Sequence, residues 1–176
     1  VAPQKEEALS DLDYTNSMLS ALARAENMLD LAEIEEELRA AGLLPPLKKK
    51  AKQAPAVPFR AFEKDGFHIF AGRNNVQNDR LLREAAGGDI WLHTQKYHSA
   101  HVLIRTEGKK VPDAVLLAAA EICAYFSDGQ AGNKIPVDWC ERRFVKKPPK
   151  SKAGFVVYTD FKTILADPNR HTELEK

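Results

Sequence analysis

Hydrophobic residues at helical spacing mark the first 44 residues of the chain. Leucines recur at intervals of three and seven, which predicts a helix over residues 6–29 with a narrow apolar stripe of the kind that coiled-coil seams use. Asp30 is expected to cap a second helix, with Glu33 completing a capping box, and Gly42 is expected to end it. This hairpin either packs on its own domain or is the end of a longer helical arm. The stripe consists of Leu12, Leu19, Leu22 and Leu29, with Leu9 and Met18 beside it.

Short apolar segments separated by turn signals begin at Phe59. Asp65 and Gly66 indicate a hairpin turn, and Pro112 fits the first turn of a helix. Because there is no repeat and no βαβ rhythm, the order predicts an α+β fold: a mostly antiparallel sheet with two packed helices, preceded by a helical hairpin fragment. The expected strands span residues 59–62, 67–71, 89–94, 101–105, 137–139, 144–145, 155–158 and 163–166, and the expected helices span residues 74–86 and 112–126.

The chain is expected to divide into four parts. Residues 1–44 form the end of a helical arm, and residues 45–58 form a linker with a lysine cluster at Lys48–Lys52. Residues 59–170 form the main domain, and residues 171–176 form a tail. Ten acidic and three basic residues give the first 46 residues a net charge of −7, whereas the rest of the chain carries +8. This asymmetry indicates that the main domain meets a polyanion, although a merely solubilising surface would look the same.

The composition points to a folded protein of the cytoplasm. The hydrophobic fraction is 44%, and no apolar run approaches the roughly 20 residues needed to cross a bilayer. Because the chain begins at Val1 in the middle of a pattern, we interpret it as a piece of a longer protein. Cys123 and Cys140 make no disulfide framework and fit a reducing compartment. We therefore expect a cytoplasmic location and no membrane partner, and the oligomeric state stays open.

A dense polar segment runs from Gly72 to Asp79, where a strand passes into a helix. A helix start binds anions through its N–H groups, and an arginine adds a bidentate contact to phosphate. Amide side chains suit sugar hydroxyls and base edges because they both donate and accept hydrogen bonds. In the alternative interpretation, Asn75 only caps the helix, and Asn78 and Asp79 only fix a loop. We favour RNA binding, with Arg73, Asn74, Asn75, Gln77, Asn78 and Asp79 as the candidate residues.

Histidines and a tryptophan cluster in the two strands that follow. Trp91 and His93 alternate onto one face, and Trp91 is expected in the core because strand tryptophans usually pack there. The spacing of His93, His98 and His101 matches no zinc motif, so we expect no metal and no cofactor. Hydrogen bonding within a polar pocket explains these residues better, and His93 and His101 join the RNA-binding candidates.

Six basic residues lie within segment 142–152. Pro148 ends the expected strand immediately, which predicts a basic loop beside an edge strand. Such charge is usually a solvated surface that also protects a sheet edge from aggregation. As phosphate contacts, Lys146 and Lys147 would add affinity without sequence selectivity.

The sequence shows none of the residue patterns that catalysis requires. It has no nucleophile–base pair, no paired carboxylates, no Walker loop and no dinucleotide fingerprint. We therefore expect a binding module and not an enzyme. A nucleic-acid enzyme that uses the histidine cluster remains as a third alternative.

Several separated motifs resemble the NFACT-R domain of ribosome quality-control factors. The similarity covers residues 59–168, and residues 11–44 resemble the end of that family's coiled-coil arm. The family commonly has a Pro-Gly-Ser-His stretch where this chain has His98-Ser99-Ala100-His101, which alters the turn before His101. The matching stretches are Asp65-Gly66, Gly72 to Asp79, Asp89 to His93, Ser99 to Val102, Ala124 to Ser127, Phe144 to Pro148, Gly154 to Tyr158 and Lys162 to Ile164.

This resemblance implies an RNA-binding module of a factor that binds the large ribosomal subunit (rRNA) with a nascent-chain tRNA and supports alanine tailing of stalled chains. The bond-making step would be the ribosome's. Many bacterial members are also labelled fibronectin-binding proteins, so a cell-surface adhesin that binds fibronectin is the alternative. We expect Arg73, Asn75–Asp79, His93, His101 and Lys146-Lys147 to form one RNA-facing surface.

Overall fold

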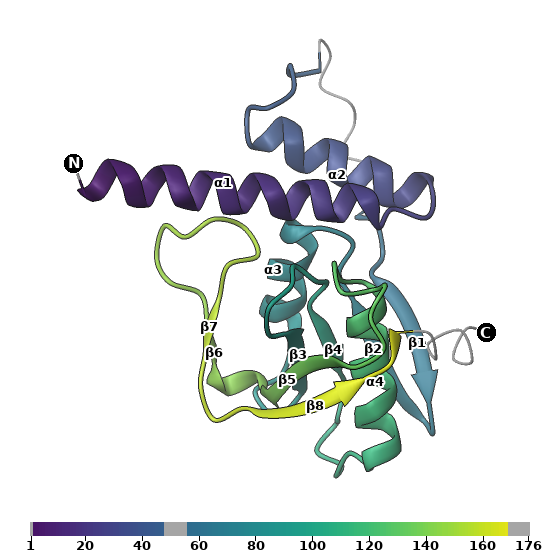
Figure 1. Cartoon of the computed structure of the whole chain (residues 1–176). Coiled ribbons are helices and arrows are strands. Elements are labelled where there is room, and N and C mark those ends of the chain that lie inside the picture. Colours follow the sequence, from purple (N-terminus) through teal and green to yellow (C-terminus); the bar gives the residue numbers. More distant parts are fainter. Residues whose placement is uncertain (1, 48–55, 169–176) are drawn as a thin grey trace.

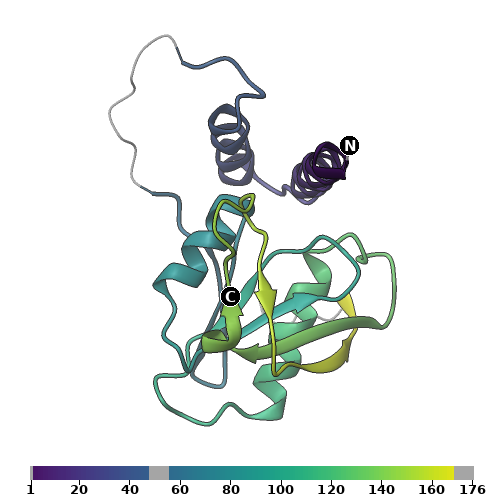
Figure 2. The same cartoon turned by 90° about the vertical axis from the view of Figure 1, so that its left-hand side faces the viewer.

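The computed structural model describes residues 2–47 and 56–168. Two helices, α1 (Ala2–Ala23) and α2 (Met28–Ala40), form an arm that lies across one end of the main domain (Figure 1). Figure 2, a view along α1, shows the two helices side by side above the domain. The lysine cluster at residues 48–52 and the expected tail lie outside the described residues.

The arm differs from the sequence expectation at the turn between its helices. The first helix ends at Ala23, six residues early, and Leu29 belongs to the second helix. The cap of α2 is Asn27, whose side-chain oxygen accepts from the backbone N–H groups of Leu29 and Asp30 at 3.0 Å. The prediction that Asp30 caps the helix is therefore wrong: this residue lies in the first turn and is fully buried. Gly42 follows the helix with a φ of 75°, as expected of a helix stop.

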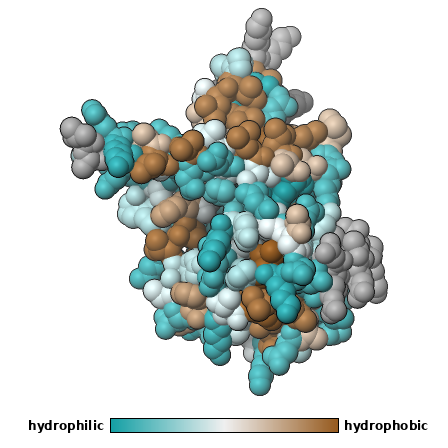
Figure 3. Space-filling model, in the orientation of Figure 1, coloured by the Kyte–Doolittle hydropathy of each residue, from teal (hydrophilic) through white to brown (hydrophobic). Residues whose placement is uncertain are grey.

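The expected leucine stripe faces solvent along the arm. Its members are about half exposed, and Figure 3 shows apolar side chains gathered over the arm. The side chains that pack inward are instead Met18, Ala21 and Ile34, which are all less than a tenth exposed. The arm therefore packs on its own domain through a small set of contacts and leaves its leucines uncovered. The exposed leucines are Leu9, Leu12, Leu19, Leu22, Leu29 and Leu31.

The main domain is built on a six-stranded antiparallel sheet in the order β1-β2-β4-β3-β5-β8. The prediction of an α+β fold with a largely antiparallel sheet is confirmed. Asp65 and Gly66 both have a positive φ and form the expected hairpin turn between the first two strands. The strands are β1 (Arg60–Lys64), β2 (Phe67–Ala71), β3 (Ile90–Thr94), β4 (Val102–Ile104), β5 (Ile135–Glu141) and β8 (Lys162–Ala166).

The two faces of the sheet are covered by different elements, because side chains alternate along each strand. Helix α4 (Asp113–Tyr125) packs on one face, against residues such as Ile69, Leu92 and Val102. Helix α3 (Asn75–Glu84) packs on the other, where its Leu81 and Leu82 meet Trp91. Trp91 is wholly buried, as predicted.

A two-stranded ribbon extends beside α3. It pairs β6 (Val145–Lys146) with β7 (Val157–Tyr158), and the chain between them, residues 147–156, forms a loop that we call the tongue. Figures 1 and 2 show the tongue reaching up to α1. The expected strand at Phe144-Val145 begins one residue later, because Arg142–Phe144 form a 3-10 turn that leads into β6.

Candidate nucleic-acid interface

A cleft of about 370 Å³ lies where the arm, the tongue and the loop between β3 and β4 meet. Tyr14 of α1 and Arg24, the residue that follows this helix, form one wall, and the tongue contributes Lys152 and Phe155 to another. Clefts of this size hold small ligands or single groups of larger ones. The cleft therefore joins residues from the first 24 positions of the chain to residues beyond position 150.

The floor of the cleft is an aromatic cluster on the sheet face that α3 only partly covers. The His93 ring stacks on Trp91 with a centroid distance of 5.8 Å, and His101 meets His93 edge to face at 5.1 Å. The indole Nε1–H of Trp91 donates to Nδ1 of His101 at 3.3 Å. The Tyr158 hydroxyl donates to the buried Asp138 carboxylate at 2.7 Å. His93 and His101 therefore share one polar pocket, as predicted.

Burial sets the protonation of these floor residues. It lowers the pKa of His93 to about 4 and lowers the pKa of His101 well below its ordinary value, since removal from water disfavours the charged imidazole. Burial, together with the Asp138 carboxylate, raises the pKa of Tyr158. Near pH 7 the floor therefore presents neutral rings, and a neutral imidazole offers one donor and one acceptor.

Three amides of the polar segment serve the fold. Asn74 caps α3, because its side-chain oxygen accepts from the Gln77 backbone N–H at 2.7 Å. The Gln77 side chain accepts from the Arg73 backbone N–H at 2.9 Å and donates to the Val57 carbonyl. Asn78 accepts from the His101 backbone N–H at 3.1 Å. Asn74, Gln77 and Asn78 are all less than 5% exposed, so their amides face the protein interior and not a solvent-accessible surface, as RNA contact would need.

Arg73 and Asn75 are bound to the arm. The Arg73 guanidinium pairs with the buried carboxylate of Asp30, and its Nε donates to the Pro58 carbonyl at 2.9 Å. The Asn75 side chain donates to the Ser17 hydroxyl at 2.8 Å. The start of α3, which was expected to bind an anion through its backbone N–H groups, binds a carboxylate of the protein itself. The backbone N–H of Asn75 donates to a Glu37 carboxylate oxygen at 3.0 Å.

The two segments expected to meet do meet, through Asp79 of α3 and Lys147 of the tongue. Their charged groups are 3.2 Å apart, and Asp79 also accepts from the Gly154 backbone N–H at 3.0 Å. Lys147 donates further to two backbone carbonyls of the tongue. Lys147 therefore holds the tongue in place. Lys146, one residue earlier, is exposed on β6 and has no ion pair among the described residues.

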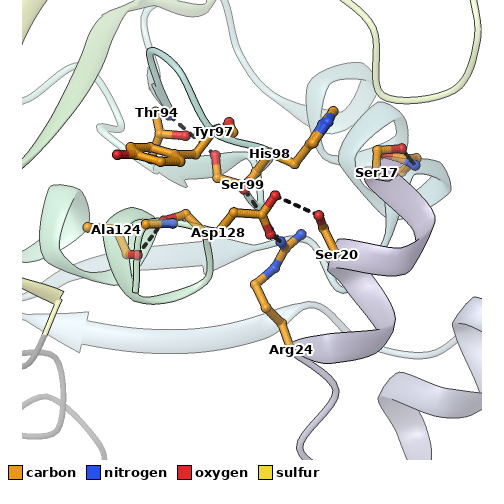
Figure 4. Close-up of polar contacts among 12 residues, drawn as sticks. Ser17, Ser20, Arg24, Thr94, Tyr97, His98, Ser99, Ala124 and Asp128 are labelled. Atoms are coloured by element: carbon orange, nitrogen blue, oxygen red, sulfur yellow. Dashed lines mark hydrogen bonds and ion pairs between the residues drawn. The ribbon is translucent and has the colours of Figure 1, made fainter. Parts of the chain in front are cut away.

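Contacts between the arm and the cleft rim involve Ser20, Arg24 and Asp128, which the sequence does not mark as site residues, together with His98. Figure 4 shows Asp128 accepting from the Ser20 hydroxyl at 2.7 Å and pairing with Arg24 at 3.1 Å. His98, on the loop between β3 and β4, reaches toward α1, where its Nε2 is 3.4 Å from an Asp13 carboxylate oxygen. The partners in these pairs are more than 80 positions apart in the sequence, so only folding brings them together.

No group of three or more histidine, cysteine, aspartate or glutamate side chains in the described part of the chain is arranged to hold a metal ion. None of its helices is long and apolar enough to cross a membrane.

Comparison with known proteins places this domain. The family described as the NFACT protein RNA binding domain matches residues 57–159. Two proteins called Rqc2 homolog RqcH are similar: that of Bacillus subtilis (strain 168) is 36% identical over 173 residues, and that of Streptococcus suis (strain 05ZYH33) is 34% identical over 165 residues. These matches cover 96% and 93% of this chain, which spans only 30% of the length of either relative.

A solved structure is similar over nearly the whole chain. It is described as the C-terminal of the fibronectin/fibrinogen-binding protein from Streptococcus suis. The TM-score is 0.90 at 32% sequence identity, and the match covers 99% of this chain and 71% of that one. The arm and the main domain therefore occur together in the same arrangement in a second protein.

Proposed function

The chain belongs to the family of the NFACT protein RNA binding domain, and from this membership we propose that the protein binds RNA through the cleft and the outer face of the β6–β7 ribbon. In this proposal a polynucleotide strand follows the ribbon, and its phosphates contact exposed lysines. The protein is then a cytoplasmic binding module and not an enzyme.

The observation that carries this proposal is that some lysines of segment 142–152 form ion pairs within the protein, whereas others are exposed and unpaired in the described part of the chain. Lys147 and Lys152 are paired with Asp79 and Asp11, at 3.2 Å and 2.7 Å. Lys146 and Lys150 are exposed, and neither has an ion pair within the described ranges. Exposed, unpaired lysines on a fixed scaffold are available to neutralise phosphates. In the cleft, the neutral and half-buried rings of His93 and Tyr158 suit bases, because stacking on rings tolerates any base.

At the level of the cell, we propose that the protein acts in ribosome quality control. The likeness to Rqc2 homolog RqcH supports this step. The RNA would then be rRNA of the large ribosomal subunit, tRNA, or both, and the whole factor would support C-terminal alanine tailing of stalled nascent chains.

The test is binding of a labelled single-stranded RNA and of purified large ribosomal subunits to the chain. The K146E/K150E variant should bind RNA at least tenfold more weakly, and the slope of log K against log salt should fall by about 1.4, since each phosphate contact on a single strand contributes about 0.7. The control is K64E/K134E, which makes the same charge change away from the ribbon. The proposal would be refuted if both double variants lost RNA binding equally, or if the parent chain bound neither the RNA nor the ribosomal subunits.

A second candidate function is binding of fibronectin, which the description of the similar Streptococcus suis structure favours. Direct binding of immobilised fibronectin to the chain, and labelling of intact cells for surface exposure, would test it. Saturable fibronectin binding that survives K146E/K150E, without any affinity for RNA, would favour this candidate over the first.

A further inference from the structure

A second hollow, of about 660 Å³, lies on the same face of the sheet at the other end of α3. The helix stops at Glu84 and leaves the sheet below it uncovered. His68 and Phe70 of β2 and Arg105, which follows β4, form the base of this hollow, and Lys109 and Arg143 stand at its edges. Because α3 has ten residues and is about 15 Å long, it separates this hollow from the cleft at its start.

Arg105 is the unusual residue of this hollow. Its Nε is shut off from solvent and has no hydrogen-bond partner among the described residues. Its guanidinium lies 5.7 Å from the centre of the Phe70 ring and has no ion pair in residues 2–47 and 56–168. A donor out of reach of water with no acceptor is costly, and native proteins rarely keep one without a reason. An anion bound in the hollow would give the guanidinium the counter-ion that the described residues do not supply.

The carboxylates around the hollow are already engaged. Glu141 pairs with Arg143 at 2.6 Å, and Glu107 lies 3.8 Å from Lys109. Asp89 is buried, and its carboxylate accepts from three donors in the neighbouring turns. Among the lysine and arginine residues that line the hollow, Arg105 is thus the one without a counter-ion in the described part of the chain.

The aromatic side chains next to Arg105 add a second element of recognition. The exposed ring of His68 stacks on Phe70 with a centroid distance of 6.4 Å and an angle of 30° between the rings. These two rings and the Arg105 guanidinium lie on one open sheet face. Aromatic rings beside an arginine on an open sheet face suit an unpaired nucleotide, because the base stacks while the guanidinium binds the phosphate.

We propose that this hollow is a second RNA-contact site, in which Arg105 binds a backbone phosphate and the His68–Phe70 pair packs against the adjoining base. The identification of the anion as RNA rests on the function proposed above. The phosphate receives a bidentate contact from the guanidinium fork. Arg143 adds charge at the rim when it exchanges its partner Glu141 for the phosphate.

The experiment follows the Nε–H NMR signal of Arg105 in the intact chain during titration with hexauridylate RNA, uridine monophosphate, inorganic phosphate and an aspartate-rich peptide. We expect the RNA to shift this signal at lower concentration than either small phosphate does. R105Q should bind the RNA at least fivefold more weakly. R105K keeps the charge but loses the guanidinium fork, so its RNA affinity should lie between those of the parent chain and R105Q. R83Q, which removes an exposed arginine of α3, is the matched control and should bind like the parent chain.

The outcomes separate this site from the cleft. If RNA binding is lost in K146E/K150E but is unchanged in R105Q, the hollow is not a contact site, and the function proposed above still holds. If the Arg105 signal moves only with inorganic phosphate or only with the acidic peptide, the assignment to RNA is overturned. Thermal melting checks that the variant is folded: R105Q removes no ion pair and only a single contact with the Phe70 ring, so its melting temperature should stay close to that of the parent chain.

Discussion

The carboxylate of Asp79 lies 3.2 Å from the ammonium group of Lys147, and this pair connects the start of α3 to the tongue. The carboxylate is mostly buried, whereas the lysine is about one-third exposed. Lys147 also donates to the carbonyls of Lys152 and Phe155, at 2.6 and 3.2 Å. The shape of the cleft therefore depends on a residue that sequence alone assigns to RNA binding.

Lys147 and Lys146 should respond differently to the same substitution. K147M removes an ion pair and two hydrogen bonds, so we expect the free energy of unfolding to fall by about 1–2 kcal/mol, a range kept low because the pair is partly screened by water. K146M should change it by less than about 0.5 kcal/mol, as exposed positions do. Urea denaturation of the two variants measures both values. Equal stability of the two would contradict the positioning role of Lys147.

The strands, the first turn and helix α4 of the main domain can be predicted from the sequence because each is marked by a local pattern. Alternation of apolar residues marked the strands, and Asp65-Gly66 marked the first hairpin turn. The apolar spacing of 112–126 marked α4, whose helix spans Asp113–Tyr125. These features depend on residues only a few positions apart, so local patterns in the sequence are enough to predict them.

Two residues of the amide-rich segment bind partners about 40 positions earlier in the chain. Asn74 donates to the Glu33 carbonyl at 2.7 Å, and Arg73 pairs with Asp30, both on α2. Nothing in the sequence indicates that the arm folds back onto α3, so these polar residues looked free. The exposure of the leucine stripe has the same origin: helical spacing defines a face but not which face packs.

Asp30 should be the residue on which attachment of the arm depends. It is fully buried and pairs with Arg73 and, at 2.9 Å, with Arg60. Burial alone would raise the pKa of Asp30, but the Glu26 backbone N–H and the two arginines hold that pKa below its ordinary value. D30N leaves two mostly buried guanidinium groups without a counter-ion, so we expect a loss of about 3–5 kcal/mol in the free energy of unfolding.

The control for this substitution is E35Q, which removes the exposed ion pair between Glu35 and Arg39 and should cost less than about 1 kcal/mol. Limited proteolysis reports on the arm itself. In D30N, cleavage between the arm and the main domain should precede cleavage of the sheet. If the arm of D30N resists protease as well as that of the parent chain, the ion-pair cluster is not what attaches it.

Gly154 and Gly42 form a matched pair that tests how closely the tongue approaches α3. Both have a positive φ, 80° and 75°. A Cβ at Gly154 would lie 2.4 Å from the Asn75 side-chain oxygen, whereas a Cβ at Gly42 would meet nothing within 4 Å. Alanine at either position should lower the free energy of unfolding by about 1–2 kcal/mol, because a side chain disfavours the left-handed backbone conformation. In G154A the free energy of unfolding should fall by about 1–3 kcal/mol more, because the added methyl group overpacks against Asn75. Thermal melting of G154A and G42A should separate the packing effect from the backbone effect.

The neutral histidines of the cleft floor should make the protein less stable in mild acid. The pKa of His93 is lowered to about 4 in the folded state, against about 6.5 when unfolded, and burial also holds the pKa of His101 well below its ordinary value. Between these values the unfolded chain binds more protons than the folded one, so stability rises with pH across this range and is lost as pH falls from about 6.5 towards 4. His101 adds a structural reason, because protonation of Nδ1 would break the bond from Trp91.

Carboxylates also titrate in this range, so the test compares the parent chain with H93F, which keeps a ring on Trp91 and removes one titrating group. Around His93 the charged or titratable neighbours are His98, His101, Asp138 and Arg24, and all four remain in the variant. We expect the parent chain to lose about 1–2 kcal/mol more than H93F between pH 7 and pH 4.5, measured by urea denaturation at each pH. Parallel curves would mean that the pKa of His93 is the same in the folded and the unfolded chain, so burial would not keep this ring neutral in mild acid.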